Sequence, residues 1–391
     1  MLDPLADKEG AAIPATDASP RPYAEGLDTP CVIVDLALLE RNVAEMAALA
    51  YVAGVALRPH VKTHKTLQIA AMQLDAGAVG LTCAKVGEAE VLADSGLTDL
   101  FVCFPIVTAT KAQRLAALAT RPSLALSTIV ESPQGVAALS AAFIGASEPL
   151  ETLVKVDTGL GRVGVAPGAA TVDLARSVAA APGLRFGGVC AHEGYTYGLA
   201  DPEERAEAAR AGVEALVETA EALSAAGLPA ARVSVGATPG IDTLATTPGV
   251  TEIRPGNYVF YDAMQVGLGV ASLDRCALRV LATVVSHAAR DRAVIDAGSK
   301  TLTTDRGVHG QATVGGYGTI VGREDIHIER LSEEHGWLHL DPAGSDVEIG
   351  DTLEIVPVHA CPVANLAHEL TVVRHGTVVE RWAVAAAGRV R

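Results

Sequence analysis

The stretch TDLFVCFPIVTATKAQRLAALATRPSLALSTIV, residues 98–130, decides the fold of this 391-residue chain. It contains two short apolar runs, 99–104 and 124–130, which are separated by an Ala- and Leu-rich run of helical periodicity. This is the pattern of a strand, a helix and a second strand. Because a helix joins the two strands, the unit is typical of an α/β protein.

The same alternation recurs from residue 29 to about residue 268. The runs that we expect to form strands are 31–35, 56–60, 79–83, 99–104, 124–130, 152–157, 186–192 and 233–236. An open doubly wound sheet is the alternative, but eight repeats of similar length favour a closed (β/α)8 TIM barrel.

Beyond about Leu268 the helical pattern stops, and runs such as 277–286, 351–356 and 370–373 have the composition of strands. We therefore predict an α/β chain in which a β-rich domain over residues 269–391 follows a barrel over residues 28–268. Residues 1–27 are rich in Pro, Ala and Asp without periodicity, so we expect a flexible N-terminal arm.

Composition limits the partners and the compartment. The formal net charge of −16 argues against a nucleic-acid partner, which would require a basic surface. The six cysteines are scattered without a CxxC pair, which fits a reducing compartment. The N-terminus lacks the pattern of a signal peptide, and no run of about 18 apolar residues predicts a membrane span. We expect a cytoplasmic protein with a small-molecule substrate.

Active sites of TIM barrels lie at the carboxyl ends of the strands. The second expected strand runs into RPHVKTHK, residues 58–65, which gathers several basic or titratable side chains. A lysine in a barrel mouth beside other cations loses its proton readily and can form a Schiff base with a carbonyl compound. A solvated basic loop is the alternative, and the spacing alone leaves both open.

Other strand ends carry further candidates. Arg162 follows two glycines of a tight turn, which by itself is a weak signal and also fits a plain loop. His192 ends the seventh expected strand; a lone histidine is more often structural than catalytic, but a strand end of a barrel favours a catalytic role. The loops VGATPG (235–240) and IRPGNY (253–258) contain glycines that expose backbone N–H groups. TIM barrels often bind a phosphate in this region, so these loops predict a phosphorylated ligand.

In the β-rich region, the segment VHACP (358–362) places His359 and Cys361 two residues apart. On a strand such residues face the same side, so an imidazole and a thiolate could bind one metal ion and leave positions open for water or substrate. By spacing alone, a buried cysteine next to a hydrogen-bonded histidine is the more frequent explanation.

Together these segments resemble the fold-type III pyridoxal-phosphate enzymes of the alanine-racemase type, and within them the D-serine dehydratase and D-threonine aldolase branch. The resemblance extends from about Thr29 to the C-terminus. The segments that carry it are RPHVKTHK (58–65), DTGLGR (157–162), RPGNY (254–258) and HACP (359–362).

The resemblance implies two cofactors. Lys62, rather than Lys65, would bind pyridoxal 5'-phosphate and also act as a catalytic residue, with His192 as a second catalytic candidate. The implied cofactor-binding residues are Lys62, Arg162 beside the phenolic oxygen, Arg254 facing the pyridine nitrogen, Tyr195, and the phosphate-binding set Gly236, Thr238, Gly256, Asn257 and Tyr258. His359 and Cys361 would bind a divalent metal, and a thiolate ligand favours zinc over manganese.

The resemblance also implies a substrate class, D-3-hydroxy amino acids. In a dehydratase acting on D-serine or D-threo-3-hydroxyaspartate, Lys62 would remove the α-proton and the metal would assist departure of hydroxide, giving a keto acid and ammonia. In a D-threonine aldolase, glycine and an aldehyde would form, with His192 or a metal-bound water as the base. His-x-Cys resembles the dehydratase pattern, whereas the familiar bacterial aldolases carry His-x-Asp.

An amino-acid racemase of the same fold is a further alternative. It would use a tyrosine such as Tyr317 as a second base and would give the metal pair no role. We expect a homodimer in which the β-rich domain of one subunit closes the barrel of the other, because the metal pair and Lys62 belong to different domains and relatives assemble head to tail.

Overall fold

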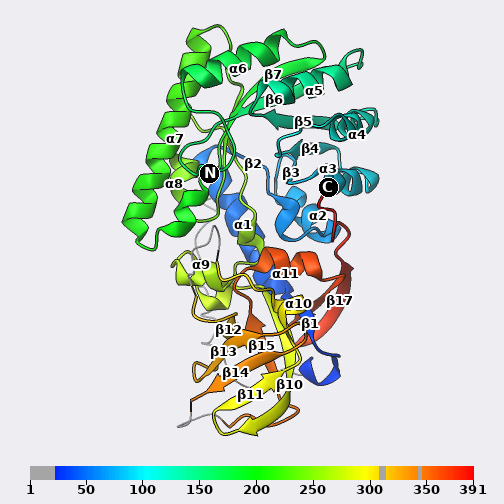
Figure 1. Cartoon of the computed structure of the whole chain (residues 1–391), viewed down its shortest axis with the longest axis vertical. Helices are drawn as coiled ribbons and strands as arrows, with labels where there is room; N and C mark the ends of the chain where they lie inside the picture. The colour runs from blue at the N-terminus through cyan, green and yellow to red at the C-terminus, as the bar shows by residue number, and fades with distance from the viewer. Residues whose placement is uncertain (1–22, 308–313, 342–345) are drawn as a thin grey trace, which may run out of the picture.

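The computed structural model describes residues 23–307, 314–341 and 346–391. Figure 1 shows two parts, a helix-covered barrel and a domain of strands below it. The barrel sheet has the strand order β2-β9-β8-β7-β6-β5-β4-β3, and all its ladders are parallel. The strands are β2 (Ala56–Leu57), β3 (Leu81–Cys83), β4 (Asp99–Val102), β5 (Ala125–Val130), β6 (Leu150–Lys155), β7 (Leu184–Cys190), β8 (Arg232–Val235) and β9 (Glu252–Ile253).

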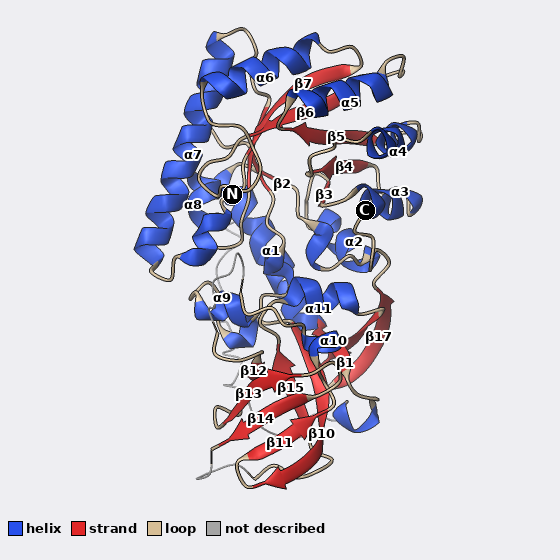
Figure 2. Ribbon diagram, in the orientation of Figure 1, coloured by secondary structure: helices blue, strands red, loops and turns tan. Residues whose placement is uncertain are grey.

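An isolated parallel bridge between His60 and Thr82 joins the two ends of this sheet and closes the ring. Helices cover its outer face, as Figure 2 shows in blue. They are α1 (Leu36–Ala53), α2 (Leu67–Asp75), α3 (Val86–Asp94), α4 (Ala109–Ala119), α5 (Pro133–Phe143), α6 (Ala169–Ala180), α7 (Pro202–Ala225) and α8 (Ile241–Thr246). The predicted (β/α)8 barrel is confirmed.

The second domain is a nine-stranded sheet of order β11-β14-β13-β12-β15-β10-β1-β16-β17. An additional pairing of β11 with β10 closes six of these strands into a ring. The strands are β1 (Cys31–Asp35), β10 (Leu278–Ala289), β11 (Arg292–Ile295), β12 (Thr319–Ile320), β13 (Ile326–Leu331), β14 (Gly336–Leu340), β15 (Thr352–Val356), β16 (Glu369–Arg374) and β17 (Thr377–Ala383). The prediction that the C-terminal part of the chain is rich in β-strands is confirmed.

One strand assignment from the sequence is wrong. Strand β1 does not belong to the barrel, because it pairs antiparallel with β10 and parallel with β16. The eighth barrel strand is β9, which has only two residues and therefore offers no periodicity to detect. The run 31–35 is apolar enough to be buried in either sheet, so composition could not assign it.

The prediction that helices stop after about residue 268 is also wrong. The second domain contains the short helices α10 (Ser299–Leu302) and α11 (Ala360–Leu366), and α9 (Ala263–Gly267) leads into the domain. Pro362 lies in the first turn of α11, where its missing N–H costs no hydrogen bond. None of the described helices is long and apolar enough to cross a bilayer.

The predicted N-terminal arm lies outside the described residues as far as residue 22. From there, Tyr23 packs against Ile33, Leu281 and Val373 of the second domain, and its hydroxyl donates a hydrogen bond to Glu354. The end of the arm is thereby attached to the β-rich domain.

At the amino ends of the barrel strands, a buried ion network joins neighbouring strands. Glu252 of β9 accepts from Arg58 Nε at 2.7 Å and from Arg232 Nη2 at 2.8 Å. Burial opposes ionisation of Glu252, but the two guanidiniums prevail and lower the pKa of its carboxyl. The cavity of about 790 Å³ at this end is lined by Arg58, Arg121, Arg185 and Arg232, each of which has a carboxylate partner.

We predict that Glu252→Gln lowers the free energy of unfolding by about 1–3 kcal/mol, because Arg58 and Arg232 lose their shared buried charge but keep Asp99 and Glu151 as partners. Urea unfolding at neutral pH measures this change. Glu369→Gln is the matched control: it breaks the exposed pair with Arg381 and should cost about 1 kcal/mol or less. Equal effects of the two variants would contradict a stabilising role for the buried network.

Candidate active site

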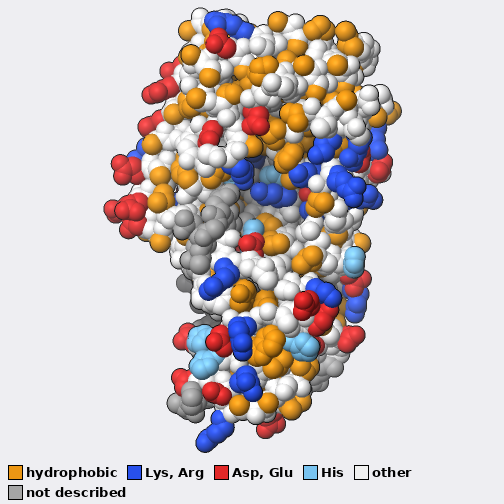
Figure 3. Space-filling model, viewed as in Figure 1, with side chains coloured by type: hydrophobic (Ala, Val, Ile, Leu, Met, Phe, Trp, Pro, Cys, Tyr) orange, Lys and Arg blue, Asp and Glu red, His pale blue; other side chains and the backbone are white. Residues whose placement is uncertain are grey.

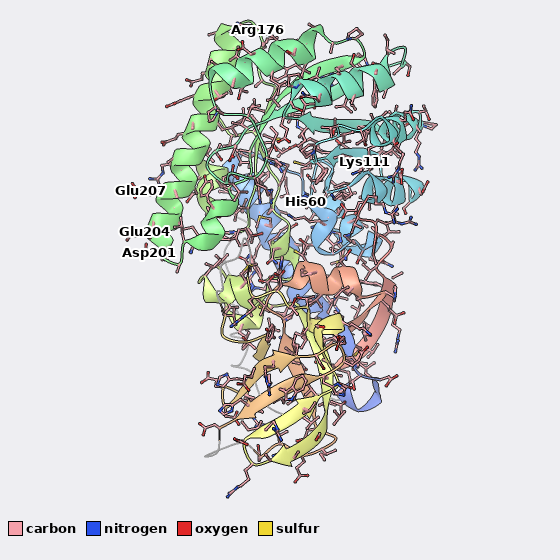
Figure 4. The ribbon with its side chains drawn as sticks, viewed as in Figure 1. His60, Lys111, Arg176, Asp201, Glu204 and Glu207 are labelled. Atoms are coloured by element: carbon pink, nitrogen blue, oxygen red, sulfur yellow. The ribbon has the colours of Figure 1, made fainter. Side chains whose placement is uncertain are left out.

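A cavity lies at the carboxyl ends of the barrel strands, where the barrel faces the β-rich domain. Figure 4 labels His60, which belongs to its wall, and Figure 3 shows Lys and Arg side chains gathered around the hollow between the two domains. The predicted site residues that line the cavity are Lys62, Arg162, His192, Gly236, Thr238, Arg254, Gly256, Asn257, His359 and Cys361.

Two predicted residues do not line this cavity. The Tyr195 hydroxyl donates to the Ala208 carbonyl oxygen at 3.3 Å, in a hollow on the outside of the barrel. The Tyr258 side chain is fully buried, and its hydroxyl accepts a hydrogen bond from Gln73 at 3.0 Å. Tyr197, two residues beyond Tyr195 in the same 3₁₀ turn, contributes the tyrosine that does line the cavity.

The two nearby lysines have different surroundings. Lys62 lies in a 3₁₀ turn (Val61–Thr63) directly after the closing bridge at His60, and its side chain lines the cavity. Lys65 is buried, pairs with Glu88 at 3.3 Å and donates to Asn365 at 2.6 Å. Lys65 is thus occupied in a structural ion pair, which leaves Lys62 as the candidate nucleophile of the segment.

His192 is held in one orientation by a hydrogen bond between its Nδ1 and the carbonyl oxygen of Gly236. The carbonyl can only accept, so Nδ1 carries the proton and Nε2 is left as the acceptor. Burial, followed by the charges of Lys62, Lys155 and Arg162, lowers the pKa of this imidazole well below its usual range. His192 is therefore neutral at physiological pH.

The floor of the cavity contains two residues that the sequence analysis did not single out, Lys155 and Cys103. Burial lowers the pKa of Lys155, and among the described residues its Nζ has no hydrogen-bond partner. Arg254 beside it donates to Ser234 Oγ at 2.7 Å and contacts Cys103 Sγ at 3.5 Å. Lys155 ends β6 directly before the segment that contains Arg162, so its position at a strand end was the available signal.

The glycine loops form a close-fitting wall that suits an anionic group. A Cβ added to Gly256 would lie 2.9 Å from Thr63 Oγ1 and 3.2 Å from the His60 carbonyl oxygen. Asn257 next to it is buried, and its Oδ1 has no hydrogen-bond partner among the described residues. The cations that line the cavity are Lys62, Lys155, Arg162 and Arg254. Backbone approach, an unpartnered amide and several cations together fit a phosphorylated cofactor.

The two predicted metal ligands face the same cavity, but not from a strand. His359 is the residue that precedes α11, and Cys361 lies in its first turn. The imidazole and the thiol still interact, because the backbone of His359 is extended (φ −136°, ψ 111°) and helical geometry begins only after it. The prediction that His359 and Cys361 lie on a strand is wrong, because Cys361 belongs to the first turn of a helix.

Each member of the pair favours the charged form of the other. Burial opposes both charges, but the thiolate of Cys361 and a 2.8 Å hydrogen bond from His359 Nδ1 to Asp305 raise the pKa of His359 to about 10. In turn, against burial, the positive charge of His359 lowers the pKa of Cys361. Thr63 Oγ1 lies 3.3 Å from the sulfur.

An imidazole and a thiolate suit a borderline-soft ion such as zinc. In the part of the chain that the structure describes, no third His, Cys, Asp or Glu completes a cluster of three with them. A metal held there would keep positions open for water or substrate. His359 and Lys62 line one cavity of one chain, so no second copy is needed to bring them together.

Comparison with known protein families gives two matches. A model described as the alanine racemase N-terminal domain matches residues 34–263. A model described as a putative serine dehydratase domain matches residues 277–373.

Full-length relatives cover both parts. D-threo-3-hydroxyaspartate dehydratase of Delftia sp. strain HT23 is 36% identical over 86% of this chain and 91% of its own length. D-threonine aldolase of Arthrobacter sp. is 33% identical over 97% of both chains.

Solved structures agree with these matches. The structure of D-threonine aldolase from Filomicrobium marinum has a TM-score of 0.86 at 36% identity, covering 93% of this chain and 97% of that one. A D-threo-3-hydroxyaspartate dehydratase described as a cysteine-to-alanine mutant in the metal-free form has a TM-score of 0.85 at 33% identity, covering 92% of this chain and 98% of that one.

We predict that iodoacetamide alkylates Cys361 of chelator-treated protein at pH 7 at least about tenfold faster than it alkylates Cys361 in His359→Ala. The thiolate is the reacting form, and loss of the neighbouring cation lets burial raise the pKa of the thiol above the working pH. Peptide mass spectrometry measures the rate. Cys31, whose pKa is raised to about 11 by burial, is the slow internal control; equal rates at Cys361 in both proteins would contradict the ion pair.

Proposed function

Because this chain belongs to the family that joins an alanine racemase N-terminal domain to a serine dehydratase domain, we propose that it is a lyase acting on D-3-hydroxy amino acids with pyridoxal 5'-phosphate and a divalent metal. Its membership of the pyridoxal-phosphate-dependent lyases follows from relatives that are aldolases and dehydratases over nearly the whole chain. The reaction and the substrate are the parts that we propose.

One observation carries the proposal. Lys62 at the barrel mouth and the His359–Cys361 pair line the same cavity, so a substrate held beside Lys62 would face a metal bound by the pair. A β-hydroxyl is the substituent that such a metal would bind. A racemase, which exchanges only the α-proton, has no use for the pair.

The chain's own residues divide the work as follows. Lys62 holds the cofactor and moves the α-proton, while Gly236, Thr238, Gly256 and Asn257 bind the phosphate. When bound, the cofactor supplies an electron sink for the charge that develops at Cα.

The remaining cations hold the cofactor ring and the substrate side of the cavity. Arg162 and Arg254 would hold the cofactor ring, and Arg254 is oriented by its hydrogen bond to Ser234 Oγ. A metal on the pair would supply Lewis acidity to the β-hydroxyl. His192, neutral with Nε2 as acceptor, can take a proton at the substrate.

We propose dehydration of D-serine or D-threo-3-hydroxyaspartate, giving a keto acid and ammonia. The thiolate of Cys361 supports this choice, and so does the dehydratase relative whose cysteine-to-alanine mutant is described as metal-free. D-threonine aldolase activity is the second candidate, supported by aldolases at 33% and 36% identity. Zinc is the metal that the donor pair favours, and the homodimer and the cytoplasmic location stay predictions.

We expect the purified protein, supplied with pyridoxal phosphate and zinc, to convert D-serine or D-threo-3-hydroxyaspartate to keto acid and ammonia. EDTA should abolish the activity and added zinc should restore it. The assay follows keto acid, glycine and aldehyde together, with D-threonine as a third substrate. Glycine with aldehyde would assign the aldolase reaction instead, and racemisation that survives EDTA would contradict the proposed class.

We also expect Lys62→Ala to abolish the visible absorbance of lysine-bound cofactor, because Lys155, the other lysine among the described residues that line the cavity, belongs to the end of a different strand, β6. Lys65→Ala should keep this absorbance while lowering stability, since it leaves Glu88 buried without its cation. Absorbance spectra and thermal unfolding of both variants are the measurements. The reverse pattern would show that Lys65 is the cofactor lysine.

A further inference from the structure

A buried carboxylate, Asp262, lies between the two halves of the proposed site without lining the cavity. Its side chain is completely inaccessible to solvent. Asp262 directly precedes α9, and its Oδ1 accepts the backbone N–H of Gln265 at 3.1 Å. This capping bond uses only one of the two carboxylate oxygens.

The other oxygen connects two distant segments. Asp262 Oδ2 accepts from Asn257 Nδ2 at 2.6 Å and from the backbone N–H of Ala360 at 2.9 Å. Asn257 is the proposed phosphate-binding amide. Ala360 lies between the proposed metal ligands, His359 and Cys361. One oxygen atom therefore holds a residue of each site.

The backbone around this atom restrains both segments. Ala263 N donates to Pro357 O at 3.0 Å, and Met264 N donates to Val358 O at 3.1 Å. These two bonds fix the strand end that leads into His359 against the start of α9. A displacement of Asn257 can thus be transmitted to α11 through a short, fully buried path.

On the cofactor side, Asn257 is held by Asp262 through its nitrogen alone. Its Oδ1 is buried and has no hydrogen-bond partner among the described residues, and Asn257 is one of the residues that line the cavity. The orientation of the amide is therefore set by Asp262. A rotated Asn257 would present a different group to the phosphate.

We propose that Asp262 is a positioning residue that couples binding of the cofactor phosphate to binding of the metal, an inference that rests on the proposed function. The cofactor phosphate orders the segment of Asn257, and the metal orders the segment of His359 and Cys361. Because Asp262 Oδ2 is hydrogen-bonded to both segments, ordering one of them also restrains the other. The second ligand then binds to a site that is already arranged, so each ligand tightens the other, and by the same factor.

The experiment uses the full chain stripped of both ligands. Pyridoxal phosphate is titrated by its lysine-bound absorbance, with and without zinc held at a fixed free concentration by a chelator buffer. Zinc affinity is measured by chelator competition, with and without pyridoxal phosphate. In the wild type, we expect each ligand to lower the dissociation constant of the other by about 5-fold or more, to the same extent.

Asp262→Asn is the main variant, because it keeps the shape but turns an amide N–H₂ toward donors. Its coupling factor should fall close to one, with both ligands bound more weakly. Asp35→Asn is the matched control: Asp35 caps α1 through Ala37 and Leu38 and lies outside the cavity, so coupling should match the wild type. A general loss of stability would affect both variants and could not remove coupling in one alone.

Each outcome decides something. Independent binding of zinc and pyridoxal phosphate to the wild type would overturn the inference while leaving the proposed function intact, as would unchanged coupling in Asp262→Asn. Failure of the wild type to bind either ligand would contradict the proposed function itself. If Asp262→Asn does not fold, Asn257→Ser removes the amide side of the same contact and should likewise abolish coupling, and retained coupling would overturn the inference.

Discussion

The parallel bridge between His60 and Thr82 is the constraint on which the site depends. It closes the barrel two residues before Lys62, and so fixes where that lysine leaves the strand. On the other side of β2, a buried ion pair between Arg58, which directly follows β2, and Glu252 joins this strand to β9. The bridge that closes the barrel therefore also determines the position of Lys62, the candidate nucleophile. A barrel that opened at this seam would lose the lysine's orientation first.

The second domain completes the cavity from the other side. Strand β1, although first in the sequence, is built into the second sheet between β10 and β16, so the chain enters the barrel from the β-rich domain. The helix α11 then returns from that domain to the barrel mouth with His359 and Cys361 at its start. The site is thus made from two separate sheets, and buried contacts such as those of Asp262 set its geometry.

Much of this could be predicted from the sequence, for physical reasons. The barrel was evident because most of its strands are apolar runs between amphipathic helices. Strand ends predicted the basic segment 58–65 and His192 as candidates, whereas the choice of Lys62 and of Arg254 came from the family resemblance. Strand β9 was missed because a strand of two residues is too short to show an alternation of apolar and polar residues. Strand β1 was assigned to the wrong sheet because its apolar residues would be buried equally well in the barrel or in the second sheet. The sequence analysis named Tyr195, whereas Tyr197 lines the cavity, because sequence does not show which side of a 3₁₀ turn faces inward. For Lys155, the sequence shows only that it ends an expected strand. For Asp262 the sequence shows nothing, because its proposed role depends on a contact with Ala360, 98 residues away in the sequence.

The central claim is that one chain brings together a cofactor lysine and a metal-binding pair. Anomalous diffraction at the zinc edge, from crystals of the protein with pyridoxal phosphate and zinc, tests it most directly. The account predicts a single strong zinc peak bonded to His359 and Cys361, facing continuous density from Lys62 to the cofactor in the same chain. Zinc bound elsewhere, cofactor joined to another lysine, or a pair that faces the Lys62 of a different subunit would contradict it.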